Sequence, residues 1–279
     1  MSAAPAPPGG IPERVREVYG ALGPGERRVA DFVLDHLAEV PGYTGAELAE
    51  ASGTSKATVS RFFRRLGFET FAQARAQART RGVPVGALPA GDPVAAHLEH
   101  ERRTLDALAA ALPAPAVEEV AALVAGARRV LVAGWRNSYP VALHLREQLL
   151  QARADVGIAP QPGQTVAEEV ASLDGRDVLV VVAFRRRTPA VGRLLETAAA
   201  LGVPCVLVAD PGARGFHHLV RHRLEVPLGG PGAFDSYAAP AVVAAVLAEA
   251  VLARRGRGGR ERVAAVARAH EALAELDGG

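Results

Sequence analysis

The 279-residue sequence has very little cysteine and very little lysine. A single cysteine, Cys205, excludes a disulfide within the chain and a zinc cluster of several cysteines, and it fits a reducing compartment. It lies in the apolar run 204–209, which predicts a buried core residue rather than a reactive thiol. Of the 32 basic residues only Lys56 is a lysine, so arginine is this chain's habitual cation and its mere presence assigns no function.

Long hydrophobic runs are also missing. The longest weakly charged stretch, 238–253, is broken by Pro240 and Glu249 and is shorter than the roughly 20 apolar residues needed to cross a bilayer. The first ten residues lack the basic and apolar regions of a signal peptide, and residues 1–12 are predicted to be a disordered tail. We therefore expect a cytoplasmic protein with no membrane partner.

The positive charge is unevenly distributed. The formal net charge is only +2, which by itself does not require a polyanionic partner. Residues 52–81, however, contain a single acidic residue and seven basic ones, a local charge of +6: Lys56, Arg61, Arg64, Arg65, Arg75, Arg79 and Arg81. DNA phosphates are the natural partner of such a concentrated patch.

Glycine and proline divide the chain into two parts. Residues 82–93 contain three glycines and three prolines, which predicts a linker. Residues 13–81 show only helical periodicity and form the first predicted domain. Residues 94–279 form the second.

The second predicted domain alternates short apolar runs with helical segments. The apolar runs are 130–133, 154–158, 178–183, 205–209 and 223–226. The helical segments are 94–112, 115–126, 138–152, 166–173, 189–201 and 236–254. Strands that are apolar on both faces and separated by helices predict an α/β fold, a doubly wound parallel sheet.

Residues 44–67 have the pattern of two helices joined by a tight turn. Gly53 stands where the turn needs a positive φ, and Thr54 or Ser55 is placed to cap the second helix. Apolar spacing assigns the buried sides to Leu48, Ala49, Val59, Phe62, Phe63 and Leu66. The outward side of the second helix is then Lys56, Ala57, Thr58, Ser60, Arg61, Arg64 and Arg65. This side suits the major groove of DNA, although a helical hairpin with a solvated basic face has the same pattern.

The segments GERRVADFVLDHLAEV (25–40) and ELAEASGTSKATVSRFFRRLGFETF (47–71) closely resemble the N-terminal domain of the RpiR/MurR family of bacterial transcriptional regulators. The resemblance implies a helix-turn-helix that binds double-stranded operator DNA, joined by a linker to a sugar isomerase (SIS) domain. It implies base contacts from Lys56, Thr58 and Arg61. The backbone contacts are then Ser55, Ser60, Arg64 and Arg65.

The first strand of the second domain leads into polar residues that open a helix. Backbone amides and the helix dipole at such a position favour an anion. The segment resembles the first ligand loop of SIS domains, with Gly134 and Ser138 at the family's Gly and Ser positions, and the expected effector contacts here are Gly134, Arg136, Asn137 and Ser138.

The second ligand loop departs from the family. SIS domains carry Ser-x-Ser-Gly-x-Thr to hold a sugar phosphate, whereas residues 183–188 read Ala-Phe-Arg-Arg-Arg-Thr. Three successive arginines repel one another unless an anion lies between them, so we expect a small anionic metabolite, a sugar phosphate or a carboxylate. The predicted contacts are Arg185, Arg186 and Thr188, with Arg187 the weakest candidate. Alternatively, these side chains extend into water or bridge to another subunit.

Four further features complete the expectations. Gln164 is a candidate specificity residue in the loop 162–165, while Thr165 with Glu168 indicates an ordinary helix start. His217, His218 and His222 fit a solvated polar segment better than a metal site, and we expect no metal or cofactor. The basic residues between Arg254 and Arg262 are predicted to form a flexible connector before a last helix, 261–276, with an auxiliary phosphate contact as the alternative.

The main hypothesis is a ligand-responsive transcriptional regulator, a dimer or tetramer, and not an enzyme. One alternative is that the SIS domain binds nothing and serves only for dimerisation. The other is a sugar-phosphate isomerase, which the loss of both serines and the glycine in 183–188 disfavours.

Overall fold

The computed structural model describes residues 10–37, 40, 43–81, 92–185, 187–232 and 234–275. They form two compact units, the first with the N-terminal helices and the second with a sheet. Among these residues, the first unit takes those up to 102 together with the short segments 211–215 and 229–235, and the second unit takes the rest. Most of the predicted tail 1–12 and of the predicted linker 82–93 lies outside the described residues.

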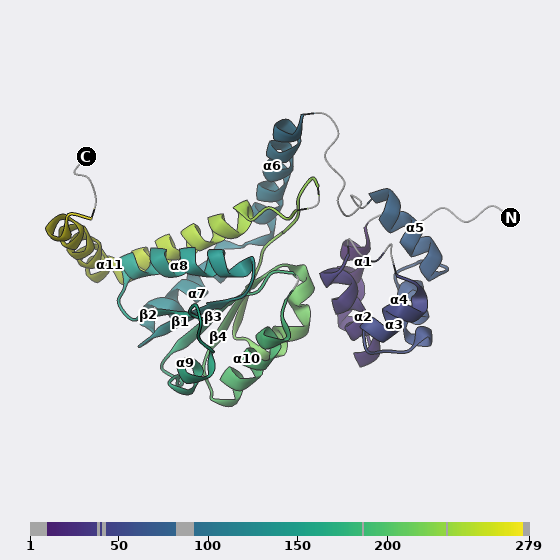
Figure 1. The fold of residues 1–279 in the computed structure, drawn as a ribbon, viewed down its shortest axis with the longest axis horizontal. Coiled ribbons are helices and arrows are strands. Elements are labelled where there is room, and N and C mark those ends of the chain that lie inside the picture. Colours follow the sequence, from purple (N-terminus) through teal and green to yellow (C-terminus); the bar gives the residue numbers. More distant parts are fainter. Residues whose placement is uncertain are drawn as a thin grey trace. The chain divides into compact units, whose positions relative to one another are not determined.

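The first unit is helical, as its periodicity predicts (Figure 1). Its elements are α1 (Ile11–Val18), a short 3-10 helix η1 (Tyr19–Ala21), α2 (Pro24–Asp35), α3 (Gly45–Ala51), α4 (Lys56–Arg65) and α5 (Phe71–Arg81). The apolar residues expected to face inward are buried in one core: Leu48, Ala49, Val59, Phe62, Phe63 and Leu66. Val29, Val33 and Leu34 of α2 join the same core. Arg14 closes this core at one side, where its guanidinium lies 5.2 Å from the ring centre of Phe68 and donates to the carbonyl of Leu66.

The second unit is built on a five-stranded sheet in the order β2-β1-β3-β4-β5, and every neighbouring pair is parallel. The strands are β1 (Val130–Gly134), β2 (Val156–Ala159), β3 (Val178–Val182), β4 (Cys205–Ala209) and β5 (His222–Glu225). The chain moves from β1 to one side of the sheet and from β3 to the other. The carboxyl ends of β1 and β3 therefore flank the switch point where ligands bind in open α/β sheets.

Helices cover both faces of this sheet, with α7, α8 and α11 on one side and α9 and α10 on the other (Figure 1). The helices are α6 (Pro93–Ala111), α7 (Ala114–Gly126), α8 (Ser138–Ala152), α9 (Ala167–Ala171), α10 (Pro189–Ala200) and α11 (Ala238–Leu273), with a 3-10 segment η3 (Pro211–Leu219). The predicted doubly wound fold is confirmed. Within the described ranges no single helix is long and apolar enough to cross a membrane, and α6 and α7 pass that test only as a pair bent by 76°.

Burial on both faces explains why the strands could be recognised from sequence. Every residue of β1, β3 and β4 is buried. Cys205 in β4 is 1% exposed, and burial raises the pKa of its thiol to about 11, so the thiol stays protonated and inert at neutral pH. The prediction of a core cysteine is confirmed.

The flexible connector predicted at Arg254–Arg262 is wrong. These residues are helical on both sides of a kink at Gly256, whose φ of 55° suits glycine. Arg255 Nη1 donates to the carbonyl of Ala125 (3.2 Å) and Arg262 Nε to that of Leu150 (3.2 Å). Both carbonyls lie in the last turn of a helix, where they lack intrahelical partners, so the two arginines tie α11 to the ends of α7 and α8.

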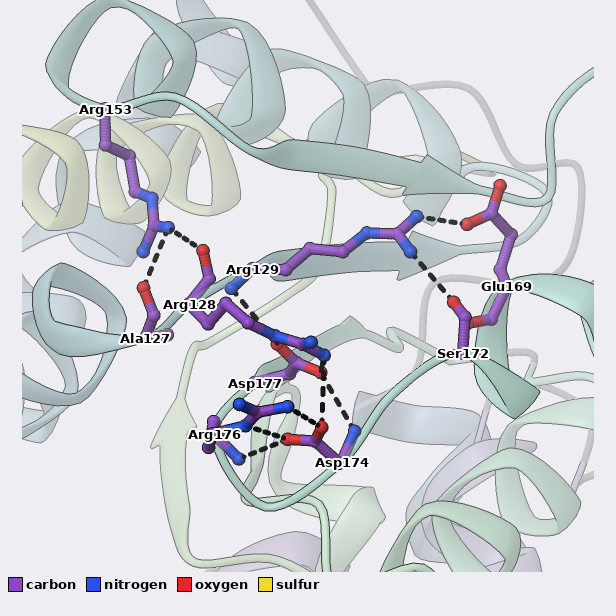
Figure 2. Close-up of polar contacts among 9 residues, drawn as sticks. All are labelled: Ala127, Arg128, Arg129, Arg153, Glu169, Ser172, Asp174, Arg176 and Asp177. Atoms are coloured by element: carbon purple, nitrogen blue, oxygen red, sulfur yellow. Dashed lines mark hydrogen bonds and ion pairs between the residues drawn. The ribbon is translucent and has the colours of Figure 1, made fainter.

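A polar network holds the amino-terminal edge of the sheet together (Figure 2). The Asp177 carboxylate accepts two hydrogen bonds from the guanidinium of Arg128, at 2.9 and 2.6 Å, and others from the backbone N–H groups of Arg129 and Asp174. Nearby, the buried guanidinium of Arg153 donates to the carbonyls of Ala127 and Arg128, both at 2.9 Å. Ion pairs and hydrogen bonds at this edge thus connect the loop that precedes β1 with the loop that precedes β3.

Asp177 should make the stability of the second unit depend on pH. The hydrogen bond from Arg128 holds the pKa of Asp177 below its usual range. The folded state therefore gains stability above the unfolded pKa of about 4 and loses it as pH falls through the lower folded value. We expect the wild type to exceed Asp177→Asn in unfolding free energy at pH 7, and the difference to shrink below pH 4, in urea titrations at several pH values.

The exposed Asp106→Asn variant is the matched control and should show no such pH-dependent difference. A gap between wild type and Asp177→Asn that stays constant from pH 7 to pH 3 would contradict this assignment.

Candidate functional site

Two local signals set the geometry of the helix pair α3 and α4. Thr44 and Glu47 cap the start of α3 reciprocally, at 3.2 and 2.7 Å. Gly53 in the turn has a φ of +61°, and the Ser55 hydroxyl accepts the N–H of Thr58 at 3.2 Å as the N-cap of α4. The sequence predictions for the turn glycine and the cap are confirmed.

The face of α4 away from the core is cationic. Lys56, Ala57, Arg61, Arg64 and Arg65 are exposed, and Ser60 is half-buried. The opposite face is fully occupied by the core, with Phe62 and Phe63 at 0% exposure. The helix therefore presents its basic residues together on one side.

Thr58 departs from the predicted outward orientation. Its side chain is only 9% exposed, because the first turn of α4 lies against α2 at Gly25. A Cβ at Gly25 would lie 3.2 Å from the Thr58 methyl, so the glycine makes room for the threonine. The Thr58 hydroxyl bonds to the Ser55 hydroxyl (2.9 Å) and accepts from Arg61 Nη2 (3.3 Å).

Arg65 differs from the other exposed arginines of α4. Its Nη1 donates to the carbonyl of Ala21 at 2.8 Å, and its Nε lies 3.6 Å from Glu26 Oε1. The side chain keeps 45% of its surface exposed. Arg65 thus fastens the end of α4 to the start of α2 and still reaches solvent.

The loops after β1 and β3 meet at the switch point of the sheet. The Ser138 hydroxyl, at the start of α8, accepts the backbone N–H of Phe184 at 3.0 Å. Gly134 lets the first turn of α8 lie close to the end of β1, because a Cβ at this position would lie 2.9 Å from Ala142 Cβ and 3.0 Å from the Ser138 carbonyl oxygen. The structure therefore brings Ser138, predicted from the first loop, against the second loop, and Gly134 allows the start of α8 to lie close to β1.

Of the three residues between Gly134 and Ser138, Trp135 is half-buried and the other two are exposed. Arg136 and Asn137 are exposed, and Arg136 has a φ of 55°, a conformation that costs energy for a residue with a Cβ. The loop holds this arginine at the carboxyl edge of the sheet in spite of that cost.

An internal carboxylate organises the three-arginine loop. Asp210, directly after β4, is 5% exposed and accepts the backbone N–H of Arg185 at 2.7 Å. It also pairs with Arg187 Nη1 at 2.6 Å, and the same nitrogen donates to the Ala183 carbonyl at 3.1 Å. The Arg187 side chain is 5% exposed, so its charge is matched inside the protein. Arg185 is half-buried, and Arg186 lies outside the described residues.

Thr188 precedes α10 at the position of an N-cap, but its hydroxyl makes no capping bond. Among the residues that the structure describes, the buried Thr188 Oγ1 has no hydrogen-bond partner. A buried hydroxyl in this state is costly, and an acceptor placed at the start of α10 would relieve that cost.

The loop after β2 gives a mixed result. Gln164 is exposed, and its N–H donates to the carbonyl of Gln161 at 3.0 Å in a turn. The predicted helix start at Thr165 is wrong, because α9 begins at Ala167. The Thr165 hydroxyl donates to Glu168 Oε2 at 2.9 Å and does not accept a hydrogen bond from a backbone N–H of the helix. Across the described ranges, no group of three or more His, Cys, Asp or Glu residues is arranged to hold a metal ion.

Sequence reasoning missed Asp210 and Tyr237. Tyr237 lies edge-on to Phe184, with 5.7 Å between ring centres, and so supports the second loop from the start of α11. Asp210 had a usable signal, because a lone acidic residue follows an apolar strand at the edge where the two ligand loops were expected. Tyr237 had none, since its contact spans about fifty residues.

Removing the internal carboxylate should destabilise the second unit. Asp210→Ala leaves the buried Arg187 without its anion, and breaking a buried pair in this way costs about 3 kcal/mol. Adding Arg187→Leu should recover part of the loss, because no charge is then left buried. Denaturant unfolding of both variants, with the exposed Glu196→Ala as control, measures this coupling. Strictly additive effects would show that the two groups do not act as a pair.

Known proteins resemble this chain in both the helix-turn-helix unit and the unit built on the sheet. Residues 9–79 match the model of the helix-turn-helix domain, rpiR family. The sugar isomerase domain of an RpiR transcription factor from Sphaerobacter thermophilus is similar to this chain, with 24% identity and a TM-score of 0.57 over 64% of this chain and 97% of that one. The Vibrio vulnificus NanR protein, in complex with ManNAc-6P, shares 19% identity with a TM-score of 0.60, over 94% of this chain and 98% of that one.

Curated relatives match a shorter share of their own length. The bifunctional protein glk of Paraburkholderia xenovorans (strain LB400) is 29% identical over 207 residues, 71% of this chain and 32% of that protein. That of Burkholderia orbicola (strain AU 1054) is 28% identical over 209 residues, with the same shares. The chain thus spans about a third of the length of these relatives.

The family model and the solved structures together identify the two units. Residues 9–79 are a helix-turn-helix domain of the rpiR family, and the second unit has the fold of the sugar isomerase domain of an RpiR transcription factor.

Proposed function

We propose that this protein is a transcriptional regulator that binds operator DNA through the exposed face of α4 and responds to a small anion bound at the switch point of the sheet. The observation that carries the proposal is the cationic side of α4, which faces outward because Val59, Phe62 and Phe63 on the opposite side are buried in the core. An α-helix presented in this way fits the major groove, and its arginines suit both guanine edges and phosphates.

The geometry of α4 sorts the proposed DNA contacts. Lys56 and Arg61, on the first two turns, are the base-reading residues, and the Thr58 hydroxyl orients Arg61 through their hydrogen bond of 3.3 Å. Arg64 is a phosphate contact, and Ser55 and Ser60 supply hydroxyls to the backbone. Arg65 contributes charge while it remains fastened to Ala21.

The proposed effector is a sugar phosphate or a carboxylate. It would lie against the loops that start at Gly134 and Ala183, close to Arg136, Arg185 and Thr188. Arg187 is buried against Asp210, and in the second loop we assign the half-buried Arg185, whose backbone N–H is held by Asp210 at 2.7 Å, to the ligand. Gln164, Asn137 and Arg186 remain candidate contacts. The NanR protein of Vibrio vulnificus, whose complex holds ManNAc-6P, makes this compound a natural first probe.

We propose a binding protein rather than an enzyme. The six positions 183–188 lack both serines and the glycine with which SIS domains hold a phosphosugar, and this disfavours isomerase activity. A dimerisation module without any ligand is the competing hypothesis, and it predicts no response to any metabolite.

A helix-turn-helix protein that reads a palindrome acts as a dimer or a higher even oligomer, and we propose a homodimer or homotetramer working in the cytoplasm. The exposure of α6 supports self-association, because Leu108 is its one buried residue while Val94 and Leu98 are 65% and 52% exposed.

Substitutions on α4 should separate base reading from phosphate binding. Arg61→Ala should cost about 1–3 kcal/mol on a matched operator and much less on scrambled DNA. Arg64→Ala should weaken binding to both DNAs alike and lower the salt dependence, because it removes one phosphate contact. Fluorescence anisotropy titrations on an operator selected from a random DNA pool measure both effects.

Arg16→Ala is the control for these titrations, since Arg16 is exposed on α1 and lies outside the proposed surface. Equal losses on matched and scrambled DNA for Arg61→Ala would remove its base-reading role.

The three-arginine loop should determine the response to anions. In a thermal-shift panel of sugar phosphates and organic acids, including ManNAc-6P, at least one compound should raise the unfolding temperature of the wild type, because ligand binding stabilises the native state. Arg185→Ala should abolish most of that shift.

Arg193→Ala, an exposed arginine on α10, provides the matched control and should respond like the wild type. Identical shifts in Arg185→Ala and wild type would show that the anion binds elsewhere, and no shift with any compound would favour the dimerisation module.

A further inference from the structure

Two neighbouring arginines of α2, Arg27 and Arg28, have different surroundings. The half-buried Arg27 donates from Nη2 to the carbonyl of Gly20 at 3.3 Å, and its guanidinium lies 6.0 Å from the ring centre of Tyr19. Arg28 is exposed, and in the part of the chain that the structure describes it makes no hydrogen bond or ion pair. The charge of Arg28 therefore faces the solvent, while that of Arg27 is used to hold the fold.

The end of the Arg28 side chain lies where α2 meets the first turn of α4. A Cβ at Gly25 would lie 4.0 Å from Arg28 Nη2 and 3.2 Å from the Thr58 methyl, so both side chains border the same glycine. The Thr58 hydroxyl in turn accepts a hydrogen bond from Arg61 Nη2 at 3.3 Å. Two guanidinium groups, one from each helix, thus lie close to Thr58.

Within the described ranges, no carboxylate balances these two charges. Glu26 and Asp31, the acidic residues of α2 within three positions of Arg28, have other partners. Glu26 accepts the N–H of the residue before α2 at 3.2 Å, and Asp31 accepts a tyrosine hydroxyl at 2.7 Å. Like charges that are held close together repel, and an anion bound between them removes the repulsion. The junction of α2 and α4 is therefore suited to an anion.

We propose that Arg28 binds a phosphate of operator DNA at the edge of the major groove that α4 enters. An α-helix with its side chains is about 10–12 Å across and the major groove is about 12 Å wide, so α4 fills the groove and α2 stays outside it. A guanidinium on α2 then meets the sugar-phosphate backbone, and its planar fork suits phosphate oxygens. The proposal rests on the proposed DNA binding by α4 and adds a contact from a second helix.

This contact also fixes the position of α4 along the DNA. Because Arg28 and Arg61 both lie close to Thr58, the phosphate bound by Arg28 flanks the base pair read by Arg61. Phosphate contacts set the register of a protein on the duplex, while base contacts carry the sequence information. Arg28 thus anchors the helix that Arg61 uses for reading.

Substitution of Arg28 tests the contact in the full-length chain. Arg28→Ala should raise the dissociation constant by about threefold to tenfold on matched and scrambled DNA alike, and should reduce the steepness of its salt dependence by about one phosphate contact. Arg28→Lys should keep the wild-type salt dependence, because an ammonium also binds phosphate as a point charge. Arg16→Ala, exposed on α1, is the matched control and should behave like the wild type. Fluorescence anisotropy titrations over a salt series measure these effects.

Neutral phosphates locate the contact on the operator. Single phosphates are replaced by methylphosphonates, one position at a time, and the base pair read by Arg61 is identified as the one at which Arg61→Ala loses its preference. The methylphosphonate beside that base pair should weaken binding of the wild type and leave binding of Arg28→Ala unchanged, because the variant no longer contacts this phosphate.

The outcomes separate this contact from the proposed function. A wild type that binds no DNA would overturn the proposed function itself. A wild type that binds DNA with the same affinity and salt dependence as Arg28→Ala, or with the same methylphosphonate pattern, would overturn the Arg28 contact alone. A loss confined to the matched operator would make Arg28 a base-reading residue and overturn the phosphate assignment. An equal loss in Arg28→Ala and Arg28→Lys with unchanged salt dependence would indicate a structural role and likewise overturn it.

Discussion

Guanidinium groups supply almost all of the positive charge in this chain, and a buried guanidinium must find acceptors for its five N–H donors. The fold meets this constraint in two ways. The buried Arg187 is matched by the carboxylate of Asp210, and the buried Arg153 is surrounded by backbone carbonyls. The exposed Arg128 in turn neutralises the buried carboxylate of Asp177. Burial lowers the pKa of Arg153, yet its carbonyl contacts join the end of α7 to the start of β1. Much of the architecture is thus held by arginines that are unavailable to a ligand.

The same constraint distinguishes functional arginines from structural ones. On α4, Arg61 and Arg64 are exposed on the side away from the core. In the loop after β3, the charge of Arg187 is neutralised by Asp210, and the same carboxylate accepts the backbone N–H of Arg185. The number of arginines in this loop is therefore larger than the number of positive charges that an effector can meet, because a buried arginine paired with a carboxylate contributes no net charge.

The sequence predicted most of the fold because the signals involved are local. Strands β1, β3 and β4 coincide with apolar runs, and Gly53 and Ser55 mark a turn and a cap within a few residues. The misjudged features depend on contacts between distant segments. Thr58 is buried because Gly25 of α2 leaves room for it, and the Gly-rich stretch near Gly256 stays helical because its arginines reach the ends of α7 and α8.

The candidate site was only partly predictable for the same reason. Gly134 and Ser138 could be recognised from their position after a strand, and the Ser138 hydroxyl does bond to the second loop at Phe184. Asp210 reaches that loop from twenty-five residues away, so its hold on Arg185 and Arg187 appears only in the folded chain. Spacing in the sequence cannot show which arginine of a triplet turns inward.

The central claim is that anion binding at the second unit and DNA binding at α4 are coupled. The direct measurement is a thermodynamic cycle: the dissociation constant for operator DNA with and without a saturating anion, and that for the anion with and without operator. Coupled sites must change each other's affinity by the same factor. Both affinities should change by the same factor, clearly different from one, whereas an anion that binds and leaves DNA affinity unaltered would show that the two sites are not coupled.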